Sequence, residues 1–256
     1  MNAARLSRTT HKWLALIVGV QLLLWAATGF YMVVVDLDFI HGDTLVRNER
    51  PRLALQGAVI PPAELRRQFK DIQGVALRAL PDDGAPVYEV ATAAGTILVD
   101  AASGQRLSPL PEARVKALAQ AHYAGPGRMA GASLLTDDAA KPTELQETPL
   151  PLWRVNFDDR FATSLYLHPD SGRLVTRRHR FWRWFDFLWS LHIMDYQTRT
   201  DVNNPLLRFA TALGATTAVT GLWLVFYSFA FFQRRRRSQV AAAPVRSKAQ
   251  IGRAGA

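Results

Sequence analysis

The chain of 256 residues contains no cysteine, so no disulfide bond braces any part of it and a folded domain must rely on its own core. Acidic residues are absent from both ends, since all 21 lie between Asp36 and Asp201. Residues 1–12 carry three cations and residues 233–256 carry seven, which together equal the net charge of +10. A nucleic-acid-binding domain would carry such an excess on its folded part. The charge distribution therefore excludes a uniformly basic nucleic-acid binder.

Two long segments also lack charge. Trp13–Val35 is an apolar run of 23 residues, and Phe209–Phe232 is one of 24. About 20 helical residues cross a bilayer, so we predict membrane-spanning helices over 13–35 and 206–232. Each cationic cluster adjoins a span on the side away from the middle, which predicts that both ends lie in the cytoplasm.

A cleaved signal peptide is the alternative for the first span. The apolar core of a signal peptide has about 7–15 residues, and this run is much longer. The small residues Ala26 and Ala27 lie deep inside it rather than after it. An uncleaved anchor is favoured, with residues 1–12 as a cytoplasmic N-terminus and 233–256 as a basic, disordered cytoplasmic tail.

The segment between the spans contains an internal repeat. Alternating apolar and polar residues predict antiparallel strands in both halves, and each half has a Ser-Gly turn, at Gly104 and at Gly172. A helix with proline in its first turn precedes each set of strands, over Pro61–Phe69 and over Pro111–Tyr123. Each half is expected to be one helix followed by about three strands, over 36–108 and 109–180.

The order of these features resembles the PepSY-associated transmembrane proteins, over roughly residues 5–233. The resemblance rests on Thr28-Gly29 in the first span, the Asp100-x-x-Ser103-Gly104 turn, Leu191-His192, and Thr220-Gly221 in the second span. The second repeat departs from the pattern because His168 stands where the aspartate is expected. The resemblance implies an α+β membrane protein, in which two transmembrane helices flank a periplasmic domain of two PepSY-like helix-plus-antiparallel-sheet repeats. It also implies a bacterial cytoplasmic (inner) membrane location.

Larger relatives in this family have four spans and resemble ferrisiderophore reductases that carry b-type haem. The resemblance thereby implies haem b as a cofactor and electron transfer in iron uptake as an activity. His192, His41 and His11 are the candidate ligands, because neutral imidazoles are common axial ligands of haem iron. His11 and His41 lie at opposite ends of the first span, so they cannot share a site in one chain, and His41 with His192 is the better pair. The alternative for each histidine is a packing or hydrogen-bonding role.

The segment 181–205 contains an aromatic stretch, Phe181–Tyr196, that is too short and too charged to span a membrane. At helical spacing Trp182, Phe185, Trp189, His192 and Tyr196 share one stripe. We predict a helix at the membrane interface, where aromatic rings concentrate. The remaining histidines, His122, His168 and His179, are expected on the surface or in the core of the domain.

No catalytic residue is predicted, because the chain has no Walker loop and no HExxH, GxSxG or CxxC motif. Gly214 and Gly221 give the second span a small-residue face, which favours packing against the first span or homodimerisation. Two functions remain open. One is an extracytoplasmic binding or accessory module for a membrane partner. The other is a haem-binding electron-transfer subunit, and any part in catalysis would be as a component of a membrane oxidoreductase.

Overall fold

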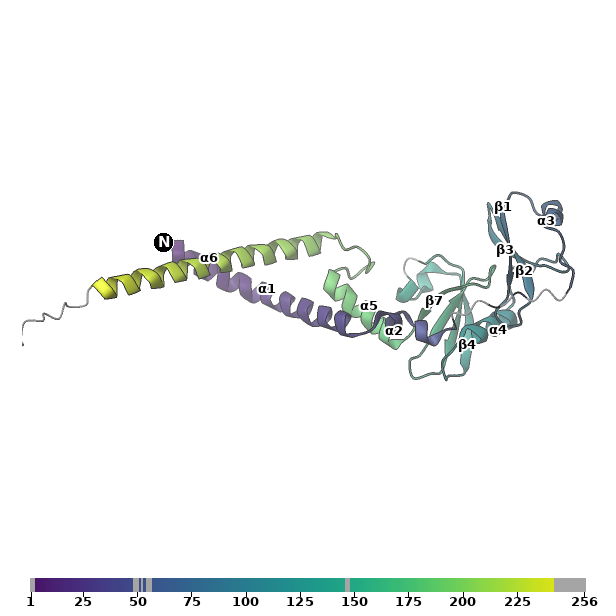
Figure 1. Ribbon diagram of the computed structural model, residues 1–256, viewed down its shortest axis with the longest axis horizontal. Coiled ribbons are helices and arrows are strands. Elements are labelled where there is room, and N and C mark those ends of the chain that lie inside the picture. The colour runs from purple at the N-terminus through teal and green to yellow at the C-terminus, as the bar shows by residue number, and fades with distance from the viewer. Residues whose placement is uncertain (1–2, 48–50, 52, 54–56, 146–147, 242–256) are drawn as a thin grey trace, which may run out of the picture. The chain divides into compact units, whose positions relative to one another are not determined.

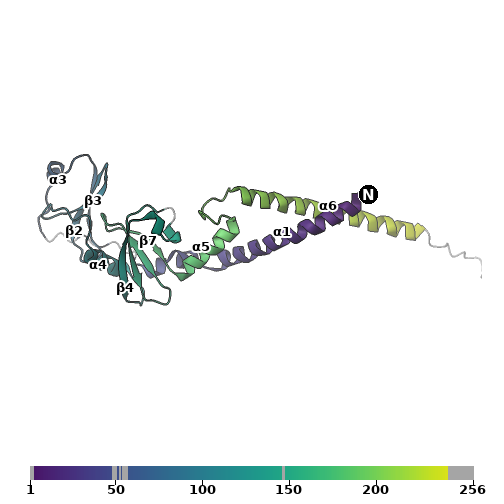
Figure 2. The same cartoon turned by 180° about the vertical axis from the view of Figure 1, so that it is seen from behind.

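The computed structural model describes residues 3–47, 51, 53, 57–145 and 148–241. It divides them into two compact units. One comprises the described residues up to 27, with 193–195 and 200–241, and the other comprises 28–192 and 196–199. The predicted fold class is confirmed: two apolar helices flank a central domain with two antiparallel sheets. Figures 1 and 2 show the ribbon from opposite sides.

The helical unit contains most of α1 (Ala3–Val34) and all of α6 (Pro205–Ala241). The stretches long and apolar enough to cross a membrane are His11–Val34 and Pro205–Phe229. Their apolar side chains are mostly exposed, as expected of surfaces that face lipid rather than a protein core. Helix α6 continues to Ala241, so residues 233–241 of the predicted disordered tail are helical, while 242–256 lie outside the described residues.

Small residues bring α1 and α6 together, and both figures show α6 beside the N-terminal part of α1. A Cβ added to Gly214 would lie 4.0 Å from Cγ1 of Val18, and one added to Gly221 would lie 3.0 Å from Cε1 of His11. The two glycines therefore pack on the first span, as one of the two sequence-based alternatives proposed.

The two-sheet unit contains the repeats. The first has helix α3 (Pro62–Gln68) and a sheet in the order β1-β2-β3 (Ile72–Ala79, Pro86–Thr92, Gly95–Asp100). The second has helix α4 (Glu112–His122) and the order β4-β5-β6-β7 (Met129–Leu135, Leu152–Phe157, Ser164–Leu167, Leu174–Arg178). Neighbouring strands are antiparallel throughout, as predicted, and the second repeat has four strands rather than three. Short helices α2 (Leu37–His41), η1 (Asp43–Leu45), η2 (Asp138–Ala140) and η3 (Thr143–Leu145) lie between these elements, and α5 (Arg180–Ile193) follows β7.

One core joins the two repeats. Leu98 of β3 belongs to the same buried cluster as Leu118 of α4 and Val155 of β5. Gly172 allows this close packing, because a Cβ there would lie 2.8 Å from Cδ1 of both Leu110 and Leu118. Its φ of +62° is also one that residues with a side chain rarely adopt. The repeats are therefore two halves of one domain rather than independent modules.

The turns of the two repeats are built by different acceptors. Asp100 Oδ1 accepts hydrogen bonds from the backbone N–H groups of Ala102 and Ser103, at 3.1 and 2.7 Å. In the second repeat, His168 Nδ1 accepts from the N–H groups of Asp170 and Ser171, at 3.2 and 3.4 Å. The imidazole nitrogen thus takes the place of the carboxylate, which explains how the repeat keeps its turn without aspartate.

A buried ion pair fastens α5 to the second repeat. The Glu144 carboxylate accepts hydrogen bonds from Arg183 and, at 2.5 Å, from the hydroxyl of Tyr166. Burial opposes ionisation of Glu144, yet the bonds from Arg183 and Tyr166 keep its pKa below the ordinary value. Because burial and the adjacent carboxylate both disfavour the phenolate, the pKa of Tyr166 is raised.

We predict that Glu144→Ala lowers the free energy of unfolding by about 3 kcal/mol, since it leaves the Arg183 charge without its partner. Urea unfolding of the detergent-solubilised protein, followed by circular dichroism, measures this change. Glu64→Ala is the control, because Glu64 forms an exposed ion pair with Arg67 whose loss should cost less than about 1 kcal/mol. Equal effects of the two substitutions would contradict the structural role of Glu144.

Candidate functional site

His11 lies on α1 and faces the Thr220-Gly221 step of α6. A hydrogen bond of 3.0 Å joins His11 Nδ1 and Thr220 Oγ1. The threonine hydroxyl also donates its hydrogen to the carbonyl oxygens of Thr216 and Thr217, at 2.9 and 3.0 Å. With the hydroxyl hydrogen directed at these carbonyl oxygens, Thr220 Oγ1 accepts from His11, whose proton then lies on Nδ1. In the neutral ring the lone pair then resides on Nε2.

His192 lies near the end of α5 and faces the Thr28-Gly29 step of α1. A 2.9 Å hydrogen bond joins His192 Nδ1 and Thr28 Oγ1, and a Cβ on Gly29 would lie 3.6 Å from His192 Cε1. The imidazole stacks on Trp189 with an interplanar angle of 16°. The predicted aromatic stripe thus reaches this histidine through Trp189, whereas Tyr196 lies beyond the end of α5 at Ile193. The glycine gives the imidazole ring room against α1.

The two histidines share one arrangement, which we call the Thr-Gly-His clamp. In each clamp a threonine hydroxyl contacts Nδ1, and the following glycine lies under the ring. A hydrogen bond at Nδ1 orients an imidazole so that Nε2 can act as a metal ligand. The same contact also joins two helices without any ligand. The clamps are therefore able to supply one imidazole each to haem iron, or to act as purely structural fasteners.

The structure does not bring the predicted pair His41 and His192 into contact. His41 ends α2 with an exposed side chain, and its backbone carbonyl accepts a 3.0 Å hydrogen bond from Arg177 Nε. Within the described residues no group of three or more His, Cys, Asp or Glu side chains converges as a metal site. Neither clamp has a second histidine of this chain beside it in the described part, so a second imidazole would have to come from outside the chain.

His179 was assigned from the sequence only to the surface or core, and the structure places it in the core with 1% exposure. Nε2 donates to the carbonyl oxygens of Phe39 and Ile40, at 2.9 and 3.1 Å. Three phenylalanine rings surround the imidazole, those of Phe39, Phe161 and Phe181. Nδ1 is buried and has no hydrogen-bond partner in the described residues. Burial lowers the pKa of His179, and repulsion from Arg183 lowers it further. The hydrogen bonds to the two carbonyl oxygens and the charge of Asp159 act in the opposite direction but do not reverse the shift.

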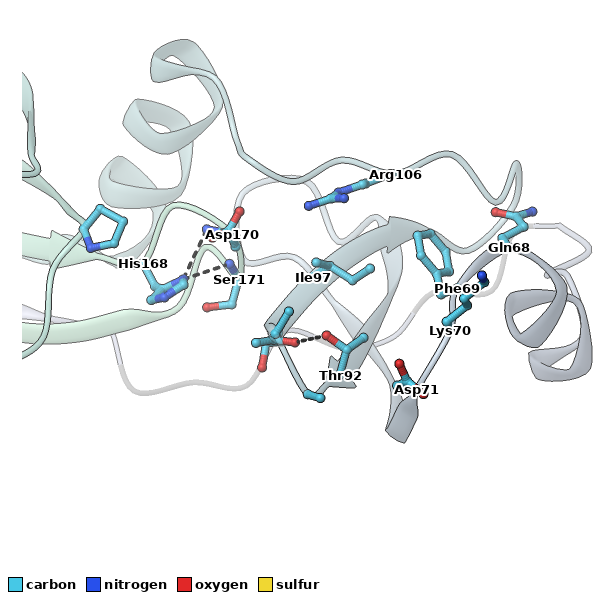
Figure 3. Close-up of a pocket in the computed structure, with 15 residues that line it drawn as sticks. Gln68, Phe69, Lys70, Asp71, Thr92, Ile97, Arg106, His168, Asp170 and Ser171 are labelled. Atoms are coloured by element: carbon cyan, nitrogen blue, oxygen red, sulfur yellow. Dashed lines mark hydrogen bonds between the residues drawn. The ribbon is translucent and has the colours of Figure 1, made fainter.

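A cleft of about 770 Å³ separates the hairpin of the first repeat from the turn of the second. Figure 3 shows His168, Asp170 and Ser171 at one end, Phe69, Lys70 and Asp71 at the other, and Ile97 between them. Arg106 lies above Ile97 in the same view. The lining therefore mixes apolar surface with charges of both signs, as in a site for a segment of protein rather than for a simple anion.

The edge of β3 opens into this cleft. Leu98 N–H donates to Ser108 Oγ at 2.7 Å, and Leu98 C=O accepts from Leu107 N–H at 2.9 Å. Thr96 lies two residues before Leu98, so its N–H and C=O point to the same edge of the sheet as those of Leu98, away from β2. The chain turns away at the cis Ser108-Pro109 bond. In the part of the chain that is described, no strand pairs with Thr96 on this side.

Comparison with known proteins identifies a family. The family model described as the PepSY-associated TM region matches residues 8–243. No curated protein and no solved structure matches the chain at a significant level. Both clamps, the cleft and the buried His179 lie inside the matched range.

We predict that the folded state loses stability as the pH falls below about 6.5, because the unfolded chain then takes up a proton that buried His179 resists. The stability that neutral His179 contributes to the folded state is fully present above the ordinary pKa of 6.5. It is lost as the pH falls toward the lower pKa that His179 has in the folded state. His122 adds to the loss with the same sign, since burial and Arg78 lower its pKa.

Thermal unfolding measured between pH 8 and pH 5 tests this dependence. The variants His179→Gln and His122→Gln should each remove part of the pH dependence of the unfolding midpoint. An unchanged pH dependence in the double variant would contradict the assignment.

Proposed function

The chain belongs to the PepSY-associated transmembrane family, and on that premise we propose that it is a membrane-anchored accessory module that binds an extended segment of a membrane partner. The open edge of β3 carries this proposal. Unpaired N–H and C=O groups on an edge strand accept a further strand, and the surrounding side chains then select its sequence.

The cleft supplies the side-chain contacts that such a segment needs. Ile97 and Phe69 provide apolar surface, and the cleft also carries charges of both signs, from Lys70, Arg106, Asp71 and Asp170. The positive charge on the terminal side of both spans, away from the middle of the chain, supports an arrangement in which the two-sheet domain lies outside the cytoplasm, in the periplasm of a bacterial inner membrane. A partner in the same membrane could present a segment there without leaving the bilayer.

The edge of β3 can be tested with a photo-crosslinking side chain at Ala94, which lines the cleft. We expect a discrete adduct with one partner in native membranes. Thr96→Pro should abolish the adduct because it removes the edge N–H, whereas Thr96→Val should retain it. A crosslinker at Leu134, which is exposed on β4, is the positional control. An adduct that forms equally at Leu134, or that survives Thr96→Pro, would count against strand addition.

Haem binding is the second candidate, and the hydrogen bond between His11 Nδ1 and Thr220 favours it. With the Nδ1 proton held by Thr220, the Nε2 lone pair is available in the neutral ring. His192 is held through Nδ1 in a similar clamp. Haem b would supply one-electron transfer, with one imidazole per clamp from this chain and the second ligand from a second copy or another subunit. Homodimerisation and a redox partner thus belong to this candidate.

Visible spectra of protein purified from haem-replete cells test this candidate. If the clamps bind haem, the reduced protein should show an α-band that His11→Ala and His192→Ala diminish. His41→Ala should leave it unchanged, because no hydrogen bond from the described residues orients the exposed His41 side chain. A protein without the band, and with the Ala94 adduct intact, would leave the accessory module as the function.

A further inference from the structure

The exposed face of α5 forms a graded stripe. Arg180, Trp184 and Phe187 follow one another at spacings of four and three residues, which places them on one side of the helix. Trp184 is 55% exposed and Phe187 is 45% exposed, and their rings meet edge to face at 6.1 Å. The three side chains and Arg183 line an open hollow of about 430 Å³. We call this surface the α5 stripe.

The position of α5 along the first helix fixes its relation to the membrane. At one end, His192 bonds to Thr28, which lies inside the apolar stretch His11–Val34. At the other end, the ring of Phe181 lies 5.3 Å from that of Phe39, which is beyond the end of the span. Helix α5 therefore runs antiparallel beside residues 28–39, with its C-terminal end beside the span and Arg180 past it.

The α5 stripe becomes less polar from the end of α5 that lies past the span toward the end that lies beside it. Arg180 stands at the end past the span, Trp184 is about 6 Å along the helix axis, and Phe187 is about 10 Å along it. A bilayer changes in this order from phosphate groups, through an interface that favours tryptophan, to hydrocarbon. A protein partner has no reason to repeat that gradient, so the stripe fits a lipid.

The charges around the stripe indicate which lipid. Arg183 is committed to Glu144 and to the carbonyl oxygen of Ala162. The guanidinium of Arg180 is exposed and makes no ion pair or side-chain hydrogen bond within the described residues. No acidic side chain lines the hollow. We propose that the α5 stripe binds an anionic phospholipid, with its phosphate at Arg180 and an acyl chain against Trp184 and Phe187.

Spin labels can measure the depth of the stripe, and the absence of native cysteine makes single-site labelling direct. The full chain is reconstituted into vesicles of phosphatidylcholine and phosphatidylglycerol, with labels at Arg180→Cys, Trp184→Cys or Phe187→Cys. Collisions with oxygen relative to a water-soluble nickel chelate should increase in the order 180, 184, 187. Leu134→Cys, equally apolar in the native chain and exposed on β4, should report water.

Lipid selectivity tests the role of Arg180. Mass spectrometry of the lipids retained by protein purified from the mixed vesicles should show enrichment of phosphatidylglycerol over phosphatidylcholine. Arg180→Gln should reduce the enrichment about five-fold, the factor that corresponds to about 1 kcal/mol for one basic side chain at an anionic surface. Arg66→Gln makes the same change of charge at an exposed position on α3 and should have no effect.

Three results would overturn the proposal. The first is a water-accessible pattern like that of Leu134→Cys at both 184 and 187. The second is dipolar broadening between labels, which would show that a second copy of the chain covers the stripe. The third is equal enrichment in Arg180→Gln and Arg66→Gln. None of these results depends on the β3 edge, so the lipid proposal and the accessory function fail separately.

Discussion

The hydrogen bond between His192 and Thr28 is the contact that holds the end of α5 against the last turns of α1. It joins the end of α5 to the outer part of α1, and Gly29 leaves room for the imidazole ring beside the bond. A polar pair of this kind is favourable next to lipid, because neither group then remains unsatisfied in an apolar environment. This bond at one end, and the packing of Phe181 on Phe39 at the other, hold α5 beside residues 28–39.

The N-terminal end of α5 is held by an ion pair and by aromatic packing. Arg183 pairs with buried Glu144, and Arg178 stacks its guanidinium 3.9 Å from the ring centre of Trp182. His179, immediately before α5, binds two carbonyl oxygens of α2 inside the phenylalanine cluster. These contacts come from separate segments, so they join α2 and α5 to the second repeat by more than the covalent chain.

The sequence alone predicted much of the framework, for identifiable reasons. The spans were evident because a bilayer requires long uncharged helices, and the repeats because half-buried strands alternate in polarity. Gly104 and Gly172 marked the turns correctly, with φ of +76° and +62°. Residues 233–241 were assigned to a disordered tail because composition shows charge and not the continuation of a helix from the span before it. The second repeat has one strand more than the three predicted, because β7 is only five residues long and ends in the basic pair Arg177-Arg178, so its alternation is weak in the sequence.

The roles of the histidines could not be predicted from the sequence alone. Six histidines were visible, and their residue type allowed ligation, capping or packing for each of them. Only the fold gives His168 to a turn, His179 to an apolar cage, and His11 to a threonine whose hydrogen is already committed. The sequence by itself determined that this protein crosses a membrane and carries a repeated domain, because length, charge and periodicity are local properties. Which nitrogen bears a proton, and which strand edge is left open, was decided by tertiary structure, because both depend on partners far away along the chain.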